Sequence, residues 1–356
     1  MADGVLQLVC ECKHDPWGKQ GKDSLAGRLW SHMPGAGELD ASETYSEVLS
    51  FAKALPLQIH PDKGLAEHLH AVDPKKFGDT NHKPEIAIAL SRFESFVGFK
   101  PLHQIAELMR LKPLEQFMPT REDFDDGALR QLCETLLSLS PDTVSETITK
   151  LQDTPMPQSG DHQHIPSLLD RLNKQYSKFD NGNLVATLLM NYMVVEPGEA
   201  VCVPADSIHA YLSGDIIECM ARSDNVLNTG FCPRPDRDDV TLFAEALTFK
   251  PHSPRDSLLP SKKSAIGLKG RSIEYGPPFS EFNVLGVTLS PTETEKHRVL
   301  QSPSILVVTQ GSGKMNVGDG TAHDIGEGDV YFAARDAELE MSTKTGLTLY
   351  RAYATF

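Results

Sequence analysis

The chain has 356 residues, of which 40% are hydrophobic, and it carries a formal net charge of −15. This length allows two or three compact units, whereas the acidic charge argues against a nucleic-acid partner, since phosphate backbones need clustered lysine and arginine. No run approaches the ~20 apolar residues of a membrane span and the first residues show no signal-peptide pattern. We therefore expect a cytoplasmic protein without a membrane partner.

The first hundred residues alternate short strands, turns and helices. Residues 5–12 and 57–60 predict strands, and residues 23–33 predict a short helix. Residues 64–77 place leucines at i and i+4, which is typical of a helix. Residues 85–90 alternate small or charged side chains with branched apolar ones, so we expect a strand with one face in a core.

From residue 101 to residue 193 the apolar pattern changes to a 3.6-residue period. Four successive stripes of leucine, isoleucine and valine predict helices, so we expect an all-helical insertion between strands. His162 and His164 lie in a polar loop before the last stripe. Their setting predicts exposure rather than metal binding.

Strand character returns at Val194, and residues 236–249 predict a helix packed on a barrel. A later stretch rich in proline, serine and lysine predicts a linker. The remaining chain predicts an antiparallel β unit, in which His323 stands alone in a turn, so this unit should be structural or an oligomer surface. The predicted domains are residues 1–100 together with 194–250, the insertion 101–193, the linker 251–270 and the C-terminal unit 271–356.

Three short motifs can place metal-binding donors around one ion. Gln58 and His60 are two residues apart, so on a strand they share a face. Glu85 starts the second strand, where Ala87 and Ala89 on the same face leave room beside it. The spacing G-x5-P-x4-H delivers His209 on a third strand. Two histidines, a glutamate and a glutamine suit Zn²⁺ or another borderline divalent ion.

Three long blocks carry a resemblance to a known family. LPLQIHPDKGLAEHLH, NHKPEIAIALSRFESFVGFKPL and PGEAVCVPADSIHAYLSGDIIECMARSDNV resemble, in that order, the signature blocks of class I mannose-6-phosphate isomerases. The resemblance implies a mainly β fold with two cupin-like barrels (jelly rolls) and a helical insertion. It also implies one Zn²⁺ per chain in the N-terminal barrel. The implied metal ligands are Gln58, His60, Glu85 and His209.

The implied reaction interconverts an aldose and a ketose, which moves a proton between two carbons through a cis-enediol. A zinc ion would polarise the carbonyl, and a tuned carboxylate or amine would carry the proton. By resemblance, Lys83, Glu218 and Asp224 are catalytic candidates and Tyr211 contacts the substrate. Either Glu218 or Asp224 could be the base, or both could form ordinary salt bridges with Arg222.

Three positions depart from the family pattern where phosphate binding is expected. Pro56 replaces a serine, Asn228 replaces an arginine, and Arg234 replaces a lysine. One hydroxyl and one fixed charge are therefore missing, and a second charge has changed shape. The chain is also several dozen residues shorter than the family between Trp17 and Gln58, so we expect a pocket that is more open on that side.

These observations leave three functional hypotheses. The first is a zinc-dependent isomerase of mannose 6-phosphate and fructose 6-phosphate. The second is a metalloenzyme of the same family that acts as an isomerase or cyclase on a different, possibly unphosphorylated substrate. The third is a non-catalytic metal-binding cupin. The expected partner is a small molecule, namely a sugar phosphate or a related polyol or carbonyl compound, and the expected assembly is a monomer or homodimer.

Overall fold

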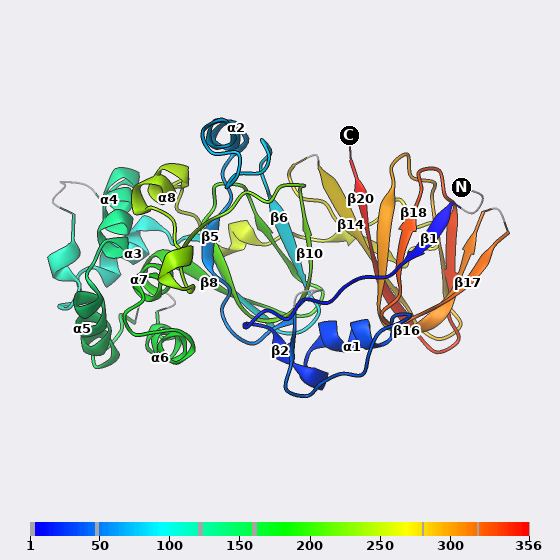
Figure 1. Cartoon of the computed structure of the whole chain (residues 1–356), viewed down its shortest axis with the longest axis horizontal. Helices are drawn as coiled ribbons and strands as arrows, with labels where there is room; N and C mark the ends of the chain where they lie inside the picture. The colour runs from blue at the N-terminus through cyan, green and yellow to red at the C-terminus, as the bar shows by residue number, and fades with distance from the viewer. Residues whose placement is uncertain are drawn as a thin grey trace.

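The structure, a computed structural model, describes residues 4–46, 50–119, 124–158, 162–279, 281–318 and 320–355. The molecule is elongated, with helices at one end, a β-barrel in the middle and a second group of strands at the other end (Figure 1). The predicted mainly β fold with a helical insertion is confirmed. Among the helices of the described residues, none has the length and apolar character needed to cross a bilayer.

The central barrel is an eight-stranded sheet organised around one long strand, β10. This strand pairs antiparallel with β4, β5, β6 and β7, so it links both sides of the barrel. The barrel strands are β4 (Ser50–Phe51), β5 (Leu57–Ile59), β6 (Glu85–Ala89), β7 (Phe93–Phe99), β8 (Met190–Val195), β9 (Ala200–Val203), β10 (His209–Met220) and β11 (Leu227–Gly230).

Alternation along β5 and β6 decides which side chains enter the barrel. Leu57 and Ile59 are fully buried in the core shared with the helices, so Gln58 between them faces the barrel interior. On β6, Ile86 and Ile88 pack toward the C-terminal strands, whereas Ala87 belongs to the core of the barrel. The same alternation therefore points Glu85 inward.

Short elements cover the outside of the barrel. Their bounds are β2 (Lys19–Gln20), η1 (Gly21–Asp23), α1 (Leu25–Ser31), β3 (Thr44–Tyr45) and α2 (Lys63–Val72). Helix α2 confirms the i, i+4 leucine pattern and begins after Asp62, whose side chain accepts a hydrogen bond from the Leu65 amide. Helix α1 packs closely on Tyr45, since a Cβ added at Gly27 would lie 2.9 Å from that ring.

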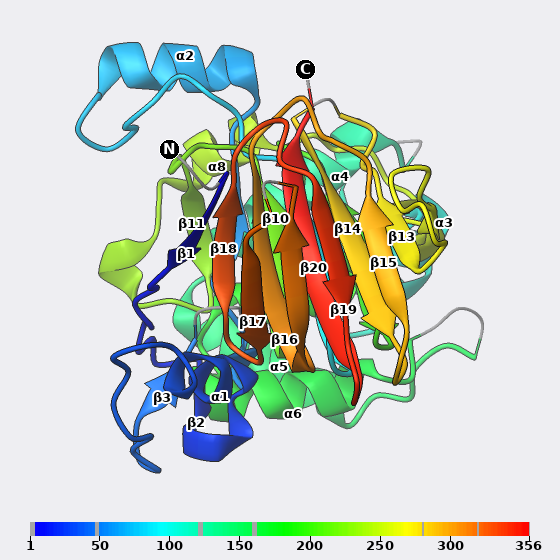
Figure 2. The ribbon, with the colours of Figure 1, turned by 90° about the vertical axis from the view of Figure 1, so that its right-hand side faces the viewer.

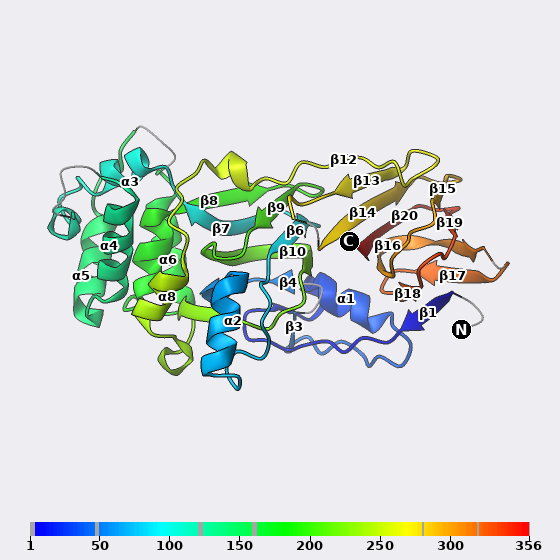
Figure 3. The ribbon, with the colours of Figure 1, turned by 90° about the horizontal axis from the view of Figure 1, so that it is seen from above.

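The predicted helical insertion is confirmed and packs against one end of the barrel (Figure 3). Its apolar stripes form one core with Leu57 and Ile59. Arg171 on α6 donates to Glu94 of the barrel at 2.7 Å, which fixes the insertion to β7. The helices are α3 (Leu102–Leu108), η2 (Glu115–Phe117), α4 (Asp126–Leu137), α5 (Pro141–Gln152), α6 (Ile165–Gln175), α7 (Asn181–Leu184), the π-helical turn η3 (Val185–Leu189) and, after the barrel, α8 (Val240–Ala246).

The prediction that His162 and His164 are exposed is wrong. His162 has no exposed surface, and its Nε2 lies 4.0 Å from Glu107 Oε2 of α3. His164 is partly buried and lies with its ring centroid 4.7 Å from that of Tyr192. His162 therefore packs inside the insertion beside α3, and His164 packs against Tyr192 of β8.

The nine C-terminal strands, β12 to β20, form an antiparallel sheet, as predicted, and the N-terminal strand β1 is its tenth strand. Tyr275, Val284 and Tyr350 pack against Ile86 and Ile88 of the central barrel, so the two β units share an apolar interface. The C-terminal strands of this sheet are β12 (Lys262–Lys263), β13 (Ser272–Tyr275), β14 (Phe282–Leu289), β15 (Thr294–His297), β16 (Ser304–Val317), β17 (Ala322–Gly326), β18 (Val330–Ala333), β19 (Leu339–Ser342) and β20 (Leu347–Ala354). Two short 3-10 helices, η4 (Arg234–Asp236) and η5 (Pro254–Ser257), lie between β11 and this sheet in the sequence.

The structure differs from the predicted domain limits in two places. Strand β1 (Val5–Leu8) pairs with β18 of the C-terminal sheet and not with the central barrel (Figure 2). The expected linker, residues 251–270, contains η5 and β12 and is tied to the barrel where the Leu259 amide donates to the Ala200 carbonyl. His323 lies within β17 rather than in a turn.

Candidate metal centre and adjoining pocket

The four predicted donors converge inside the central barrel. His60 Nε2 lies 3.1 Å from Glu85 Oε1, and His209 Nε2 lies 3.6 Å from Glu85 Oε2. Gln58 Nε2 lies 3.1 Å from His209 Nε2. The two histidines and Glu85 are fully buried, and their ligand atoms lie within 4.8 Å of one another, a spacing that could hold one metal ion.

The backbone orients both histidines for metal binding. His60 Nδ1 lies 2.7 Å from the Asn225 carbonyl oxygen, and His209 Nδ1 lies 3.0 Å from the Ser207 carbonyl oxygen. Each Nδ1 therefore carries the proton, which leaves each Nε2 lone pair directed at the common centre. Among the described residues, no group forms a well-directed hydrogen bond with the buried His60 Nε2. Such an orphaned acceptor fits a ligand atom.

Gln58 completes the donor set if its amide oxygen faces the centre. The amide is placed with its nitrogen toward His209, but the two ends of an amide differ only by a half-turn. With the oxygen turned inward, the set has two imidazole nitrogens and two oxygens. This set fits Zn²⁺ and similar divalent ions.

The charge distribution favours a cation at this centre. Burial lowers the pKa of His209 to about 4, so that imidazole is neutral at pH 7. Burial alone would raise the pKa of Glu85, but the neighbouring His60, His209 and Lys83 outweigh it and lower that pKa. Glu85 is therefore an ionised carboxylate beside the neutral imidazole of His209.

A second carboxyl group faces the same interior. Glu218 on β10 pairs with Ala87 on β6 and so shares its inward face. Burial and the negative charge of Glu85 raise the pKa of Glu218 well above its usual value. Two close carboxyls cannot both ionise readily, so Glu85 carries the charge and Glu218 holds a proton.

Two further candidate residues, Lys83 and Tyr211, lie beside Glu85. Lys83 Nζ is 3.4 Å from Glu85 Oε1, and the hydroxyl of the buried Tyr211 is 3.5 Å from Glu85 Oε2. Asp224 lies elsewhere: it is exposed, and its amide donates to Asp79 Oδ2 at 3.0 Å. The structure thus brings Lys83, Tyr211 and Glu218 to the metal centre and leaves Asp224 on the surface beyond β10.

A cavity of about 630 Å³ opens next to β5, the strand that carries Gln58. Pro56 precedes Gln58 by two residues, and Asn228 is the cross-strand partner of Gln58 on β11. Both line the cavity together with Arg234, so the three positions that depart from the family pattern meet in one place. Asn228 Oδ1 is buried without a hydrogen-bond partner among the described residues, and Arg234 is exposed.

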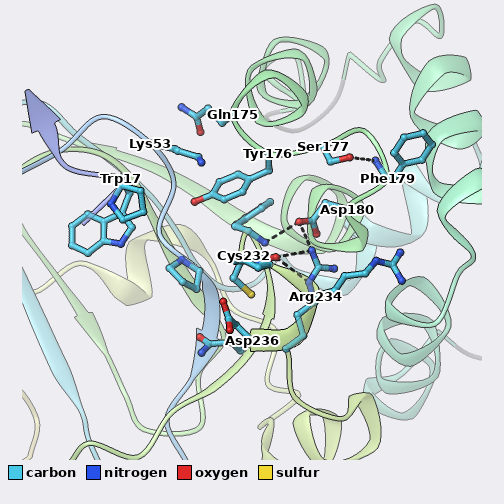
Figure 4. A pocket seen from close by; sticks show the side chains of 16 residues that line it. Trp17, Lys53, Gln175, Tyr176, Ser177, Phe179, Asp180, Cys232, Arg234 and Asp236 are labelled. Carbon is cyan, nitrogen blue, oxygen red and sulfur yellow. Dashed lines mark hydrogen bonds and ion pairs between the residues drawn. The ribbon is translucent and has the colours of Figure 1, made fainter. Parts of the chain in front are cut away.

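The other wall of this cavity comes from the helical insertion (Figure 4). Tyr176 and Asp180 line it, together with Lys53 and Arg237. Arg237 donates to Asp180 Oδ2 at 2.7 Å and to the Cys232 carbonyl at 3.0 Å. Sequence reasoning missed these residues, because nothing in the chain signals that the end of α6 meets the segment before β5.

Comparisons with known proteins agree with this geometry. A family model described as phosphomannose isomerase type I, catalytic domain, matches residues 46–102. The mannose-6-phosphate isomerase of Ogataea parapolymorpha is 35% identical over 326 residues, which is 86% of this chain and 76% of the relative. The mannose-6-phosphate isomerase of Schizosaccharomyces pombe is 32% identical over an alignment of 415 residues, covering 98% of this chain and 99% of the relative.

Solved structures show the same fold. A variant of phosphomannose isomerase from Salmonella typhimurium superimposes with a TM-score of 0.80 at 19% identity, over 99% of this chain and 100% of the other. Mannose 6-phosphate isomerase from the same bacterium, bound to substrate and zinc, gives a TM-score of 0.73 at 23% identity, over 86% and 78%. By its sequence identity to curated relatives over most of its length, the chain belongs to the type I mannose-6-phosphate isomerase family.

Proposed function

We propose that the protein is a zinc-dependent isomerase that interconverts mannose 6-phosphate and fructose 6-phosphate. One observation carries the proposal: a buried His60–Glu85–His209 group that could hold a metal faces the same barrel interior as Glu218, a carboxyl group with a raised pKa. Metal binding and proton transfer are the two requirements of aldose–ketose isomerisation through an enediol. The curated relatives are named mannose-6-phosphate isomerases, and the solved bacterial isomerase is bound to fructose 6-phosphate, which supports this substrate pair.

The residues of the chain divide the work between them. His60, Glu85, His209 and the Gln58 oxygen would hold the ion, and a bound Zn²⁺ supplies Lewis-acid polarisation of a carbonyl. Glu218, when it loses its proton, removes a proton from one of the two reacting carbons and returns it to the other. Its raised pKa makes it a stronger base than an ordinary carboxylate.

Lys83 and Tyr211 stabilise the ionised form of the Glu218 carboxyl. The ammonium of Lys83 lowers the pKa of Glu218, opposing the effect of burial, so it stabilises the base in its ionised form. The Tyr211 hydroxyl also stabilises that form by hydrogen bonding.

The test is a coupled assay on zinc-loaded protein with mannose 6-phosphate as substrate. We expect turnover in the wild type, and we expect Glu218→Gln to lower kcat by roughly 10²- to 10⁴-fold with zinc content unchanged. His60→Ala should lose the zinc itself by elemental analysis. Asp224→Asn separates the two carboxyl candidates, because the exposed Asp224 should alter kcat little. Full activity in Glu218→Gln with a large loss in Asp224→Asn would reverse the assignment.

A second function is favoured by the cavity. Pro56 has no hydroxyl and no amide hydrogen, and Asn228 provides only neutral donors, so the wall beside Gln58 lacks part of the phosphate-binding chemistry of the family. The alternative is an isomerase or cyclase of the same family acting on an unphosphorylated substrate. A wild type that binds zinc but turns over neither mannose 6-phosphate nor mannose would bring this alternative to the front.

A further inference from the structure

The cavity beside β5 is lined by Lys53, whose backbone is held by hydrogen bonds on both sides. The amides of Ala52 and Lys53 donate to the Trp17 carbonyl at 3.0 and 3.3 Å. Gln175 accepts from the Ala54 amide at 3.2 Å and donates to the Ala52 carbonyl at 3.2 Å. The chain on either side of Lys53 is therefore held in one position relative to α6.

The side chain of Lys53 is fixed as well. Its Nζ lies 4.0 Å from the centroid of the Tyr176 ring, and the Tyr176 hydroxyl donates to the Ala54 carbonyl. Figure 4 shows Lys53 and Tyr176 together on the wall of the cavity. A cation over an aromatic face loses little of its ability to donate hydrogen bonds, since the ring contacts only one side of the ammonium.

Lys53 is also a charge that the protein does not neutralise. Among the described residues, no carboxylate forms an ion pair with Lys53, whereas Arg237 in the same cavity donates to Asp180 at 2.7 Å. Lys53 is partly buried, so holding it without a counter-charge costs stability that a surface position would not. An anionic group of a ligand would supply the missing charge.

We propose that Lys53 binds the phosphate group of the substrate and determines the preference for a phosphorylated sugar. This inference rests on the proposed function. Pro56 and Asn228 line the cavity next to the candidate metal ligand Gln58. Lys53 lines it beside Tyr176 of the insertion. A sugar whose reacting carbons lie in the barrel would extend its far end into this cavity, where Lys53 provides a fixed ammonium in place of the charge that Asn228 lacks.

The test compares Lys53→Met with Lys178→Met in the zinc-loaded protein. Lys178 is a matched control: its Nζ lies 5.2 Å from the centroid of the Phe179 ring, it is exposed, and it does not line the cavity. Both changes remove one positive charge. Lys53→Met should lower kcat/KM for mannose 6-phosphate roughly 10- to 100-fold, with less than about a twofold change for mannose. Lys178→Met should leave both values unchanged, and Lys53→Arg should retain most of the preference.

A binding measurement separates this inference from the proposed function. Trp17 lines the cavity, so its fluorescence can follow a titration of the zinc-loaded protein with inorganic phosphate. Phosphate should bind Lys53→Met more weakly than it binds the wild type and Lys178→Met. If the wild type turns over neither sugar, the proposed function fails while this titration still decides the role of Lys53. Equal phosphate binding in Lys53→Met and the wild type, or equal losses for both sugars, overturns the inference.

Discussion

Replacing Asn225 by aspartate should weaken zinc binding although Asn225 is not a metal ligand. Its carbonyl oxygen accepts from His60 Nδ1 at 2.7 Å, and the residue is 1% exposed. The side-chain nitrogen Nδ2 of Asn225 donates to the Asp79 carbonyl at 2.9 Å, to Asp79 Oδ1 at 3.2 Å and to the Asn81 carbonyl at 3.2 Å. These three contacts hold in place the carbonyl that orients His60.

The size of the effect follows from the contacts that are lost. Asn225→Asp keeps the shape of the side chain but removes both N–H donors and places a carboxylate against Asp79 and two carbonyl oxygens. The loop must move to relieve this repulsion, and His60 Nδ1 then loses its acceptor. An unsatisfied buried donor costs about 1–3 kcal/mol, which corresponds to roughly a 10- to 100-fold loss of zinc affinity, the usual range for such supporting contacts.

The measurement is competition between the protein and a chelator for zinc, together with the absorption spectrum of the cobalt-substituted protein, which reports ligand geometry. Asn81→Ala is the matched control, because it removes a side-chain hydrogen bond between the same two loops, from Asn81 Nδ2 to the Arg222 carbonyl at 3.0 Å, and keeps the Asn81 carbonyl that accepts from Asn225. Wild-type zinc affinity in Asn225→Asp would refute the reasoning. Equal losses in both variants would show that the loops matter only as a whole.

Three further predictions concern specificity, stability and the insertion. Asn228→Arg should raise kcat/KM for mannose 6-phosphate relative to mannose by roughly tenfold or more, since an arginine adds charge-assisted bonds to phosphate; an unchanged ratio in the coupled assay would contradict this. Burial alone would raise the pKa of Glu94, but two hydroxyls and Arg171 lower it to about 2, so its stabilising contribution is complete above about pH 4.5 and disappears as the pH falls toward 2. Glu94→Gln should therefore cost about 2–3 kcal/mol in urea unfolding at pH 7, and a loss of the same size at about pH 2.5 would exclude this explanation. Replacing both His162 and His164 by alanine should destabilise the insertion yet leave about one zinc per chain; loss of the metal would mean that the site is misplaced.

The metal centre could be predicted because its signals are local. Gln58 and His60 are two residues apart, and Glu85 and His209 each begin a strand, so alternation alone puts all four donors on inner faces. The same alternation places Glu218 opposite Ala87. A short pattern with a fixed period therefore predicted the candidate ligands, whereas Glu218 was named by resemblance, with Asp224 as the alternative.

The cavity wall could not be predicted, because it depends on contacts between distant segments. Lys53 meets Tyr176 across more than a hundred residues of chain, and neither residue belongs to a motif. His60 is oriented by the backbone carbonyl of Asn225. Asn225 lies within the ECMARSDNV block, but a backbone contact cannot be predicted from the type of side chain. Asp224 in that same block was placed in the site by resemblance, whereas the turn after β10 leaves it exposed.

A network of buried polar side chains in the C-terminal sheet could not be predicted from the sequence either. Arg351 has no exposed surface and lies 3.1 Å from His297 Nδ1, while His297 Nε2 lies 3.1 Å from the Ser272 hydroxyl. That hydroxyl donates to Glu295 Oε2 at 3.0 Å. The chain of hydrogen bonds connects a buried cation to a buried anion through two neutral groups, which makes both charges tolerable inside the sheet.

The pairing of β1 with β18 has a consequence for the synthesis of the protein. Val5 pairs with Ala333, so β1 must wait for a partner made roughly 330 residues later, on the order of tens of seconds at ribosomal rates. During that time the central barrel and the insertion can fold, but the first strand is an open edge available to other chains. Its length of four residues limits that risk. Because β1 pairs only with a strand of the C-terminal sheet among the described strands, its removal would expose the edge of β18 and so would be a defect of that distant sheet.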